Sequence, residues 1–203
     1  MEKNPYIRSF SRYQQLARRT QNPALTDRER LLHASLGLCA EVEELRDEMS
    51  KVMSGFLVQE TEVAKETGDV MWMLAELCDA IHADMDVVLC RENLQMAESI
   101  RKNGTHEYAG PKPVTKWKNI DDIGQLAGCI AGCVQKTFQG HPVNDTKIAY
   151  AIPAVVVRLV NLAPQYSFTL YQAMYQNIEK LKARYPDGFS ADKSIHRKEY
   201  DHE

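Results

Sequence analysis

The chain has 203 residues, a formal net charge of −3, 44% hydrophobic residues and 26% charged residues. These values are ordinary for a globular protein of one or two small domains, and they offer no basic excess for a nucleic-acid or membrane surface. No apolar stretch close to the roughly 20 residues of a membrane span stands out, and the N-terminus is polar. We therefore expect a cytoplasmic protein without nucleic-acid or membrane partners.

Helical periodicity runs through most of the chain and strand signals are almost absent, which predicts an all-α fold. In the first half the predicted helices cover residues 7–20, 27–53, 59–82 and 84–102, with Thr26 or Asp27 capping the second. Residues 103–118 carry two glycines and two prolines and are predicted to be a linker. Further helices are predicted at 121–139, 145–162 and 167–185, followed by a polar tail at 186–203. The five cysteines lie in apolar helical segments and are expected to be small buried side chains.

Two pairs of acids in the first half lie beside the apolar stripes of their helices. Glu41 and Glu44 are three residues apart at the edge of one stripe, and Glu66 lies on the stripe of the next helix with Asp69 beside it. An acid directed at a core costs on the order of several kcal/mol unless a cation compensates it. Glu76 and Asp79 have the same spacing, but we expect them on a solvated face.

A divalent cation is the simplest compensation for these inward-facing acids, because no matching cluster of lysines or arginines faces them within the two helices. Carboxylate oxygens suit Mg²⁺, with Mn²⁺ as a substitute, and no set of thiols or imidazoles competes. Facing pairs of carboxylates could hold one ion or more and bind a polyphosphate. The sequence therefore predicts a metal site for phosphoryl chemistry without a P-loop.

Four segments carry a resemblance to a known family: YQQLARRT (13–20), LGLCAEVEELRDE (36–48), EVAKETGDVMWML (62–74) and NIEKLKARYPDGFSADKSIHR (177–197). Together they resemble the MazG-like all-α nucleoside triphosphate pyrophosphohydrolases, of the superfamily that includes dUTPase-like and dCTPase-like enzymes. The resemblance implies a helical bundle of MazG type with Glu41, Glu44, Glu66 and Asp69 as Mg²⁺ ligands and catalytic residues. It further implies hydrolysis of a nucleoside triphosphate at the α-phosphorus, giving a nucleoside monophosphate and pyrophosphate. Ala40 departs from those members that have a Glu at this place, and Glu43 or Glu48 is a candidate for an additional role.

The second half can be aligned with the first as a copy without the acids. An offset of 87 places Gly128 and Ala131 at the positions of Glu41 and Glu44, and an offset of 85 places Ala151 and Ala154 at those of Glu66 and Asp69. The predicted organisation is an acidic repeat at 1–102, the linker, a degenerate repeat at 119–185 and the tail. Two such repeats would form a pseudo-dimer, and a homo-oligomer of pseudo-dimers stays open.

The remaining candidate residues would bind the substrate. The family's Asn-x-x-Lys-Leu-x-x-Arg pattern is intact around Lys180 and Arg184, whereas the first half has only Asn93. We expect the second half to lend these cations to the first, although cations at a helix end also have a purely structural explanation. Trp72 is a candidate for stacking on a base, with a core position as the alternative. His33 and His82 are expected to be structural.

Two other classes of protein bear on this prediction. A ferritin-like di-iron bundle needs Glu-x-x-His motifs on two helices, and the predicted helices contain none. A non-enzymatic helical interaction module remains the alternative to an enzyme.

Overall fold

The computed structural model describes residues 7, 9–54, 60–89 and 115–196, and every regular element within these ranges is a helix. The prediction of an all-α protein is therefore confirmed. The helices are α1 (Phe10–Arg18), α2 (Asp27–Met53), α3 (Glu60–Ala80), α5 (Lys116–Thr137), α6 (Asp145–Leu162), the 3₁₀ turn η1 (Ala163–Tyr166), α7 (Leu170–Arg184) and α8 (Ala191–Ile195). Residues 85–89 are also helical, and they are the only helical part of the predicted segment 84–102 within the described residues.

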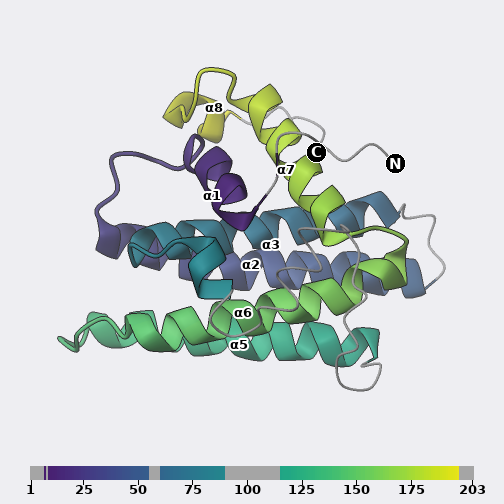
Figure 1. Cartoon of the computed structure of the whole chain (residues 1–203), viewed down its shortest axis with the longest axis horizontal. Helices are drawn as coiled ribbons and strands as arrows, with labels where there is room; N and C mark the ends of the chain where they lie inside the picture. Colours follow the sequence, from purple (N-terminus) through teal and green to yellow (C-terminus); the bar gives the residue numbers. More distant parts are fainter. Residues whose placement is uncertain (1–6, 8, 55–59, 90–114, 197–203) are drawn as a thin grey trace.

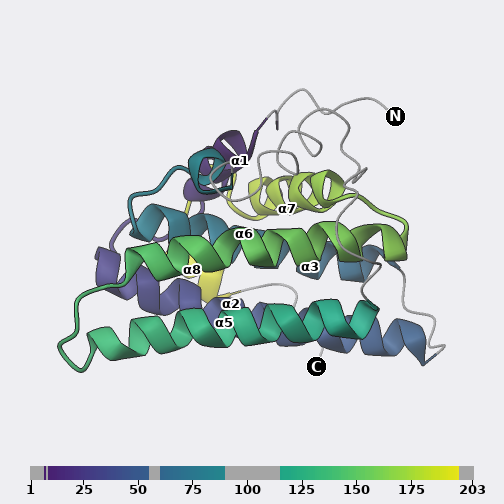
Figure 2. The same ribbon diagram turned by 60° about the horizontal axis from the view of Figure 1, so that its bottom comes forward.

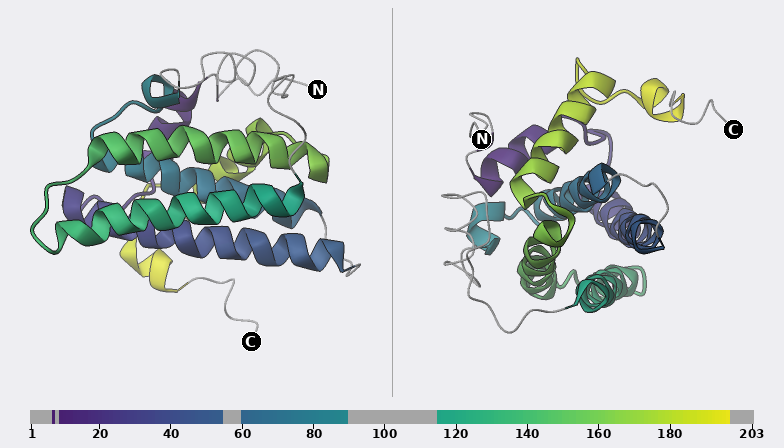
Figure 3. Two further views of the ribbon diagram at one scale, coloured as in Figure 1. Left: turned by 90° about the horizontal axis from the view of Figure 1, so that it is seen from below. Right: turned by 90° about the vertical axis from the view of Figure 1, so that its right-hand side faces the viewer.

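Four long helices form a bundle, and two shorter helices lie across one side of it (Figure 1). The antiparallel pair α2 and α3 packs against the pair α5 and α6, as the end-on view in Figure 3 shows. Figure 2 shows α5 and α6 running side by side along one face of the bundle. Helices α1 and α7 both pack on α3, so the last long helix of the second half contacts the third helix of the first. The apolar faces of all these helices meet in one continuous core.

Local capping explains why α2 and α6 begin and end where the sequence predicts. Thr26 caps α2 in a reciprocal capping box with Glu29, and Asn144 caps α6 through a 3.0 Å bond from the Lys147 amide. At the end of α3, His82 has a φ of 52° and the Ala83 amide bonds the Cys78 carbonyl at 2.8 Å. That left-handed residue is a Schellman-type stop, so α3 ends two residues earlier than predicted.

Two predicted helix starts were wrong in the second half. Helix α5 begins at Lys116 instead of residue 121, because the Thr115 hydroxyl accepts a bond from the Lys118 amide at 3.1 Å. Residues 116–118 therefore belong to a helix and not to the linker. Helix α7 begins at Leu170 instead of residue 167, because Ser167 has a φ of 60° and Thr169 supplies the cap.

The burial pattern of the two helix pairs repeats at a single spacing of 85 residues. The buried residues Leu38, Val42 and Leu45 of α2 correspond to the buried Ile123, Ala127 and Ile130 of α5. In the second pair, the buried positions of α3 correspond in the same way to those of α6: Val63 to Ile148, Val70 to Val155, Leu74 to Leu159 and Leu77 to Leu162. The predicted offset of 87 matches burial less well in the first pair, since it pairs buried Leu38 and Leu45 with the exposed Gln125 and Gly132. At a spacing of 85, Glu41 and Glu44 are matched by Leu126 and Cys129, neither of which is acidic.

Among the described residues, one helical segment is long and apolar enough to cross a membrane by length and composition, namely Asp145–Tyr166, which comprises α6 and η1. In the structure 56% of its most apolar window is buried inside the molecule, as in the core helix of a soluble protein. The fold is therefore compatible with a soluble protein. Among the described cysteines, Cys78 and Cys133 are buried as expected, whereas Cys129 is exposed on α5.

Gly68 is where α3 and α7 come closest, and the structure predicts a strong effect of adding one methyl group. A Cβ at this position would lie 2.8 Å from the Ala173 carbonyl oxygen and 2.8 Å from the Asn177 Cβ. We expect Gly68→Ala to destabilise the protein by about 1–3 kcal/mol, measured by urea unfolding, because backbone atoms must move. Gly128→Ala is the matched control, since its Cβ would have no neighbour within 4 Å and alanine favours the helix. Equal stabilities for the two variants would contradict this packing.

Candidate metal site

Three acids from two helices converge on one point of the molecule. Glu41 of α2 and Glu66 and Asp69 of α3 each offer a carboxylate oxygen, and these oxygens lie within 4.8 Å of one another. Glu66 is only 6% exposed, and the other two are half-buried. Side chains three apart on α3 share a face, and the antiparallel packing of α2 brings Glu41 to that face. The structure therefore brings together three of the four predicted metal ligands.

Glu44, the fourth predicted ligand, is exposed and lies outside this group of three. It lies one helical turn after Glu41, and its charge raises the pKa of both Glu41 and Glu66. Of the two auxiliary candidates, Glu43 forms an ion pair with Arg46 and Glu48 forms one with Lys51.

Burial and mutual repulsion make the cluster costly when its acids are ionised. Burial, followed by the charges of Asp69, Glu44 and Glu66, raises the pKa of Glu41 to about 8. Burial and then the charge of Asp69 raise the pKa of Glu66 to about 7. Each carboxylate disfavours ionisation of the next because like charges lie close together in a partly dry environment. A cation bound among them would relieve both effects.

Two lysines place their amines on the cluster: Lys65 of α3 lies 3.5 Å from Glu66, and Lys180 of α7 pairs with Asp69. The Lys180 amine lies 2.7 and 2.5 Å from the two carboxylate oxygens of Asp69. Asn177, one turn earlier, donates its side-chain amide to Asp69 at 2.7 Å. Arg184, one turn after Lys180, is half-buried, and Asn93 lies outside the described residues.

A buried tyrosine fixes the orientation of Asn177. The hydroxyl of Tyr13, from α1, lies 3.0 Å from the Asn177 Oδ1 and 3.2 Å from the Gly68 carbonyl oxygen, and it can donate to either acceptor. Because the amide oxygen of Asn177 faces this donor, its amide nitrogen faces Asp69. Sequence spacing does not predict this role of Tyr13, since the contact joins residues 164 positions apart in the chain.

Trp72 lies one turn after Asp69 but is partly buried against the core. Its indole nitrogen donates to the Thr20 hydroxyl at 3.0 Å, and its ring meets His33 edge to face with centroids 6.2 Å apart. Both predicted alternatives for this residue, a core position and contact with a ligand, are therefore compatible with its partial exposure.

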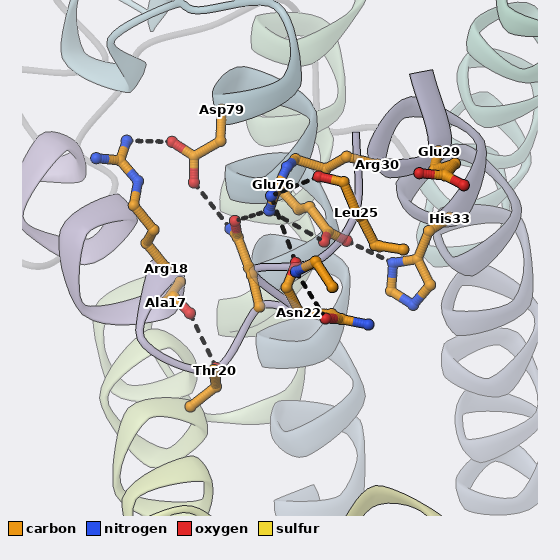
Figure 4. Close-up of polar contacts among 12 residues, drawn as sticks. Ala17, Arg18, Thr20, Asn22, Leu25, Glu29, Arg30, His33, Glu76 and Asp79 are labelled. Carbon is orange, nitrogen blue, oxygen red and sulfur yellow. Dashed lines mark hydrogen bonds and ion pairs between the residues drawn. The ribbon is translucent and has the colours of Figure 1, made fainter. Parts of the chain in front are cut away.

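The prediction that Glu76 and Asp79 are solvated was wrong, because both carboxylates are buried in a polar cluster at the end of α3 (Figure 4). Asp79 accepts bonds from the amides of Gln14 at 2.7 Å and Gln21 at 2.8 Å, and it also pairs with Arg18. These donors come from α1 and the loop after it, a segment that no spacing within α3 could reveal.

A cavity of about 530 Å³ adjoins Asp79, but it lies about 15 Å along α3 from Asp69. Most of the charged and amide groups lining it are bonded to one another, including Ser11 with Asp84 and His82 with Asp27. We place the candidate site at Glu41, Glu66 and Asp69 instead, because in the described part of the chain only these acids converge as a group of three.

The donor set of this site fits a hard divalent cation. All three converging groups are carboxylates, and no thiol or imidazole belongs to the group within the described residues. Oxygen ligands of this kind are those that Mg²⁺ and Mn²⁺ prefer. The fold and site thus define an all-helical protein with a carboxylate cluster that pairs with two lysines, Lys65 and Lys180. Compared with known proteins, the chain matches no family model, no curated protein and no solved structure.

Proposed function

We propose that this protein is a Mg²⁺-dependent nucleoside triphosphate pyrophosphohydrolase of MazG type. The observation that carries the proposal is the convergence of Glu41, Glu66 and Asp69 with the Lys180 amine on the same spot. Such a site joins ligands for a divalent cation to a positive group that can bind a phosphate oxygen. The bound cation and the lysine would together hold a triphosphate by attracting its negative charge.

The roles follow from where the side chains lie. Glu41, Glu66 and Asp69 would hold Mg²⁺, with Glu44 close enough to add a ligand from its exposed position. When bound, the ion supplies positive charge to the triphosphate and makes a water molecule more acidic. Lys180 would exchange Asp69 for a phosphate oxygen of the substrate, and Arg184, one turn further along α7, would extend the same basic edge. The products would be a nucleoside monophosphate and pyrophosphate.

The second half would be a degenerate copy that completes the site of the first. The single spacing of 85 residues between the two buried patterns supports a repeat, as does the antiparallel pairing of α2 with α3 and of α5 with α6. Leu126, Cys129, Ala151 and Ala154 stand where the first half has its acids. In this arrangement α7 contributes Lys180 in the way that a second subunit would in a dimer.

Product analysis tests the proposed reaction. Purified protein is incubated with each of the common ribonucleoside and deoxyribonucleoside triphosphates, with Mg²⁺ or with EDTA, and the products are separated by ion-exchange chromatography. We expect monophosphate and pyrophosphate from at least one substrate, and none in EDTA. Diphosphate and inorganic phosphate would contradict cleavage at the α-phosphorus. No Mg²⁺-dependent product from any substrate would favour the non-enzymatic interaction module.

Substitution of Lys180 tests the contribution of α7. We expect Lys180→Ala to raise KM for the triphosphate about tenfold, because one charge-assisted contact to phosphate is lost. Affinity for Mg²⁺, measured by calorimetry, should not fall, since the amine competes with the ion for Asp69. Lys182→Ala is the matched control, because Lys182 lies two positions after Lys180 on the same helix and pairs with Glu179. Unchanged kinetics in Lys180→Ala would remove Lys180 from the substrate site.

A further inference from the structure

Glu76 is an anomaly in the helix pair that carries the candidate metal site. Its side chain is fully buried, and its Oε2 lies 2.6 Å from the Nδ1 of His33 on α2. Its Oε1 has no hydrogen-bond partner among the described residues and makes only a long ion pair, 3.9 Å from the Arg30 guanidinium. A buried carboxylate with one hydrogen-bonded oxygen and one long ion pair is costly, so Glu76 is a candidate for a role beyond packing.

His33 connects the buried Glu76 carboxylate to the surface of the protein. Its side chain is 51% exposed, and its Nε2 points away from Glu76 (Figure 4). The hydrogen bond to Glu76 raises the pKa of His33, so the ring with a proton on both nitrogens is favoured. The result is a fixed imidazole whose outer nitrogen is a donor.

This donor lies on the same pair of helices as the acid cluster. Glu76 lies two helical turns after Asp69, about 10 Å along α3, and His33 lies about 12 Å before Glu41 along α2. Trp72 lies between them, one turn after Asp69, with its ring 6.2 Å from that of His33. The imidazole and the indole thus lie about one nucleoside length from the point where the phosphates would bind.

We propose that His33, held by Glu76, binds the nucleoside end of the triphosphate by donating its Nε2–H to a carbonyl oxygen of the base. The inference rests on the proposed function, since it takes the phosphates to lie at Glu41, Glu66 and Asp69. Trp72 contributes the apolar wall beside this contact. Bases with a carbonyl group, such as uracil and guanine, are then favoured over adenine, which has none.

Calorimetry at pH 6.5 in Mg²⁺ measures the base contact separately from the phosphate contacts. The probes are the non-hydrolysable α,β-imido analogues of UTP and ATP, and tripolyphosphate, which has no nucleoside. We expect wild-type protein to bind the UTP analogue about tenfold more tightly than the ATP analogue, which is the effect of one hydrogen bond from a charged donor. Equal affinity for the two analogues would overturn the proposal. Binding of none of the three probes would instead refute the proposed function.

Two variants remove the donor in different ways. His33→Phe keeps a ring against Trp72, and the double variant His33→Phe with Glu76→Leu also removes the buried carboxylate that the single change would leave unpaired. Both should bind the UTP analogue about tenfold more weakly and tripolyphosphate within twofold of wild type. His82→Asn is the control, because His82 lies just after the end of α3 and pairs with Asp27. Asparagine also tolerates the positive φ of this residue. A parallel loss for tripolyphosphate, or no loss for the UTP analogue, would overturn the role of His33.

Discussion

Replacing Glu66 by glutamine is expected to abolish nucleotide hydrolysis and, at the same time, to raise the melting temperature of the metal-free protein at pH 8. The loss of hydrolysis follows because Glu66 is the most deeply buried of the three converging acids, and an amide is a poor ligand for Mg²⁺. We expect kcat/KM to fall at least about 1,000-fold, which corresponds to roughly 4 kcal/mol of transition-state stabilisation.

The gain in stability has a separate physical reason. Burial raises the pKa of Glu66 to about 7, so at pH 8 the metal-free protein carries an ionised group that its surroundings disfavour. Glutamine has nearly the same shape and no charge. Glu179→Gln is the control, because Glu179 of α7 is 45% exposed and pairs with Lys182 rather than with a partner of Glu66. Normal hydrolysis by Glu66→Gln, or a melting temperature below that of wild type, would contradict the assignment of this acid.

The second large effect is on the pH dependence of thermal stability without metal. The pKa values of Glu41 and Glu66 rise from 4.5 to about 8 and about 7 in the folded protein, so the folded state binds more protons than the unfolded state between these values. Their contribution to stability is therefore fully present below about pH 4.5 and is lost as the pH rises through 7 to 8. We expect the melting temperature of the metal-free protein to decrease from pH 5.5 to pH 8.5.

Mg²⁺ should reverse this decrease, because a divalent cation binds the ionised carboxylates of the folded state. At ten times the dissociation constant, binding contributes about 1.4 kcal/mol, or roughly 3–6 °C in melting temperature for a chain of this size. The increase should be larger at pH 8 than at pH 5.5, and it should be absent in the double variant Glu41→Gln with Glu66→Gln. Differential scanning fluorimetry measures the melting temperatures of wild type and of the double variant. The difference between the two proteins cancels the contribution of other titrating groups, such as His33. A Mg²⁺ effect that is the same at both pH values would argue against a site built from these acids.

Caps next to the helix made the starts of α2 and α6 predictable, but the starts of α1 and α7, capped by Ser9 and Thr169, were predicted three residues too early. Thr26 with Glu29 and Asn144 mark α2 and α6 in this way, and both helices begin and end as predicted. The start of α5 was missed because Thr115 follows a segment rich in proline and glycine, so that the cap was counted as part of the linker. Local chemistry thus determines helix ends better than composition does.

The residues of the candidate site likewise fall into those that local spacing could predict and those that it could not. Glu41, Glu66 and Asp69 could be found because helical spacing places them on apolar stripes, and α2 and α3 are neighbours in sequence. The bonds of Asp69 to Asn177 and Lys180 span more than 100 residues, and only the family resemblance pointed to Lys180. The contact between His33 and Glu76 could not be predicted from either helix alone, because each residue occupies a position where a polar side chain is ordinary. Contacts between distant helices depend on how the bundle packs, and spacing within one helix does not encode that.

Anomalous scattering from crystals grown with Mn²⁺ is the most direct measurement of whether a divalent cation occupies the acid cluster. Data collected at the manganese edge should show a strong peak bound by the carboxylates of Glu41, Glu66 and Asp69, and this peak should vanish in crystals of Glu66→Gln. No peak at this place in saturating Mn²⁺, with the three side chains turned toward solvent, would contradict the metal site and the reaction proposed for it.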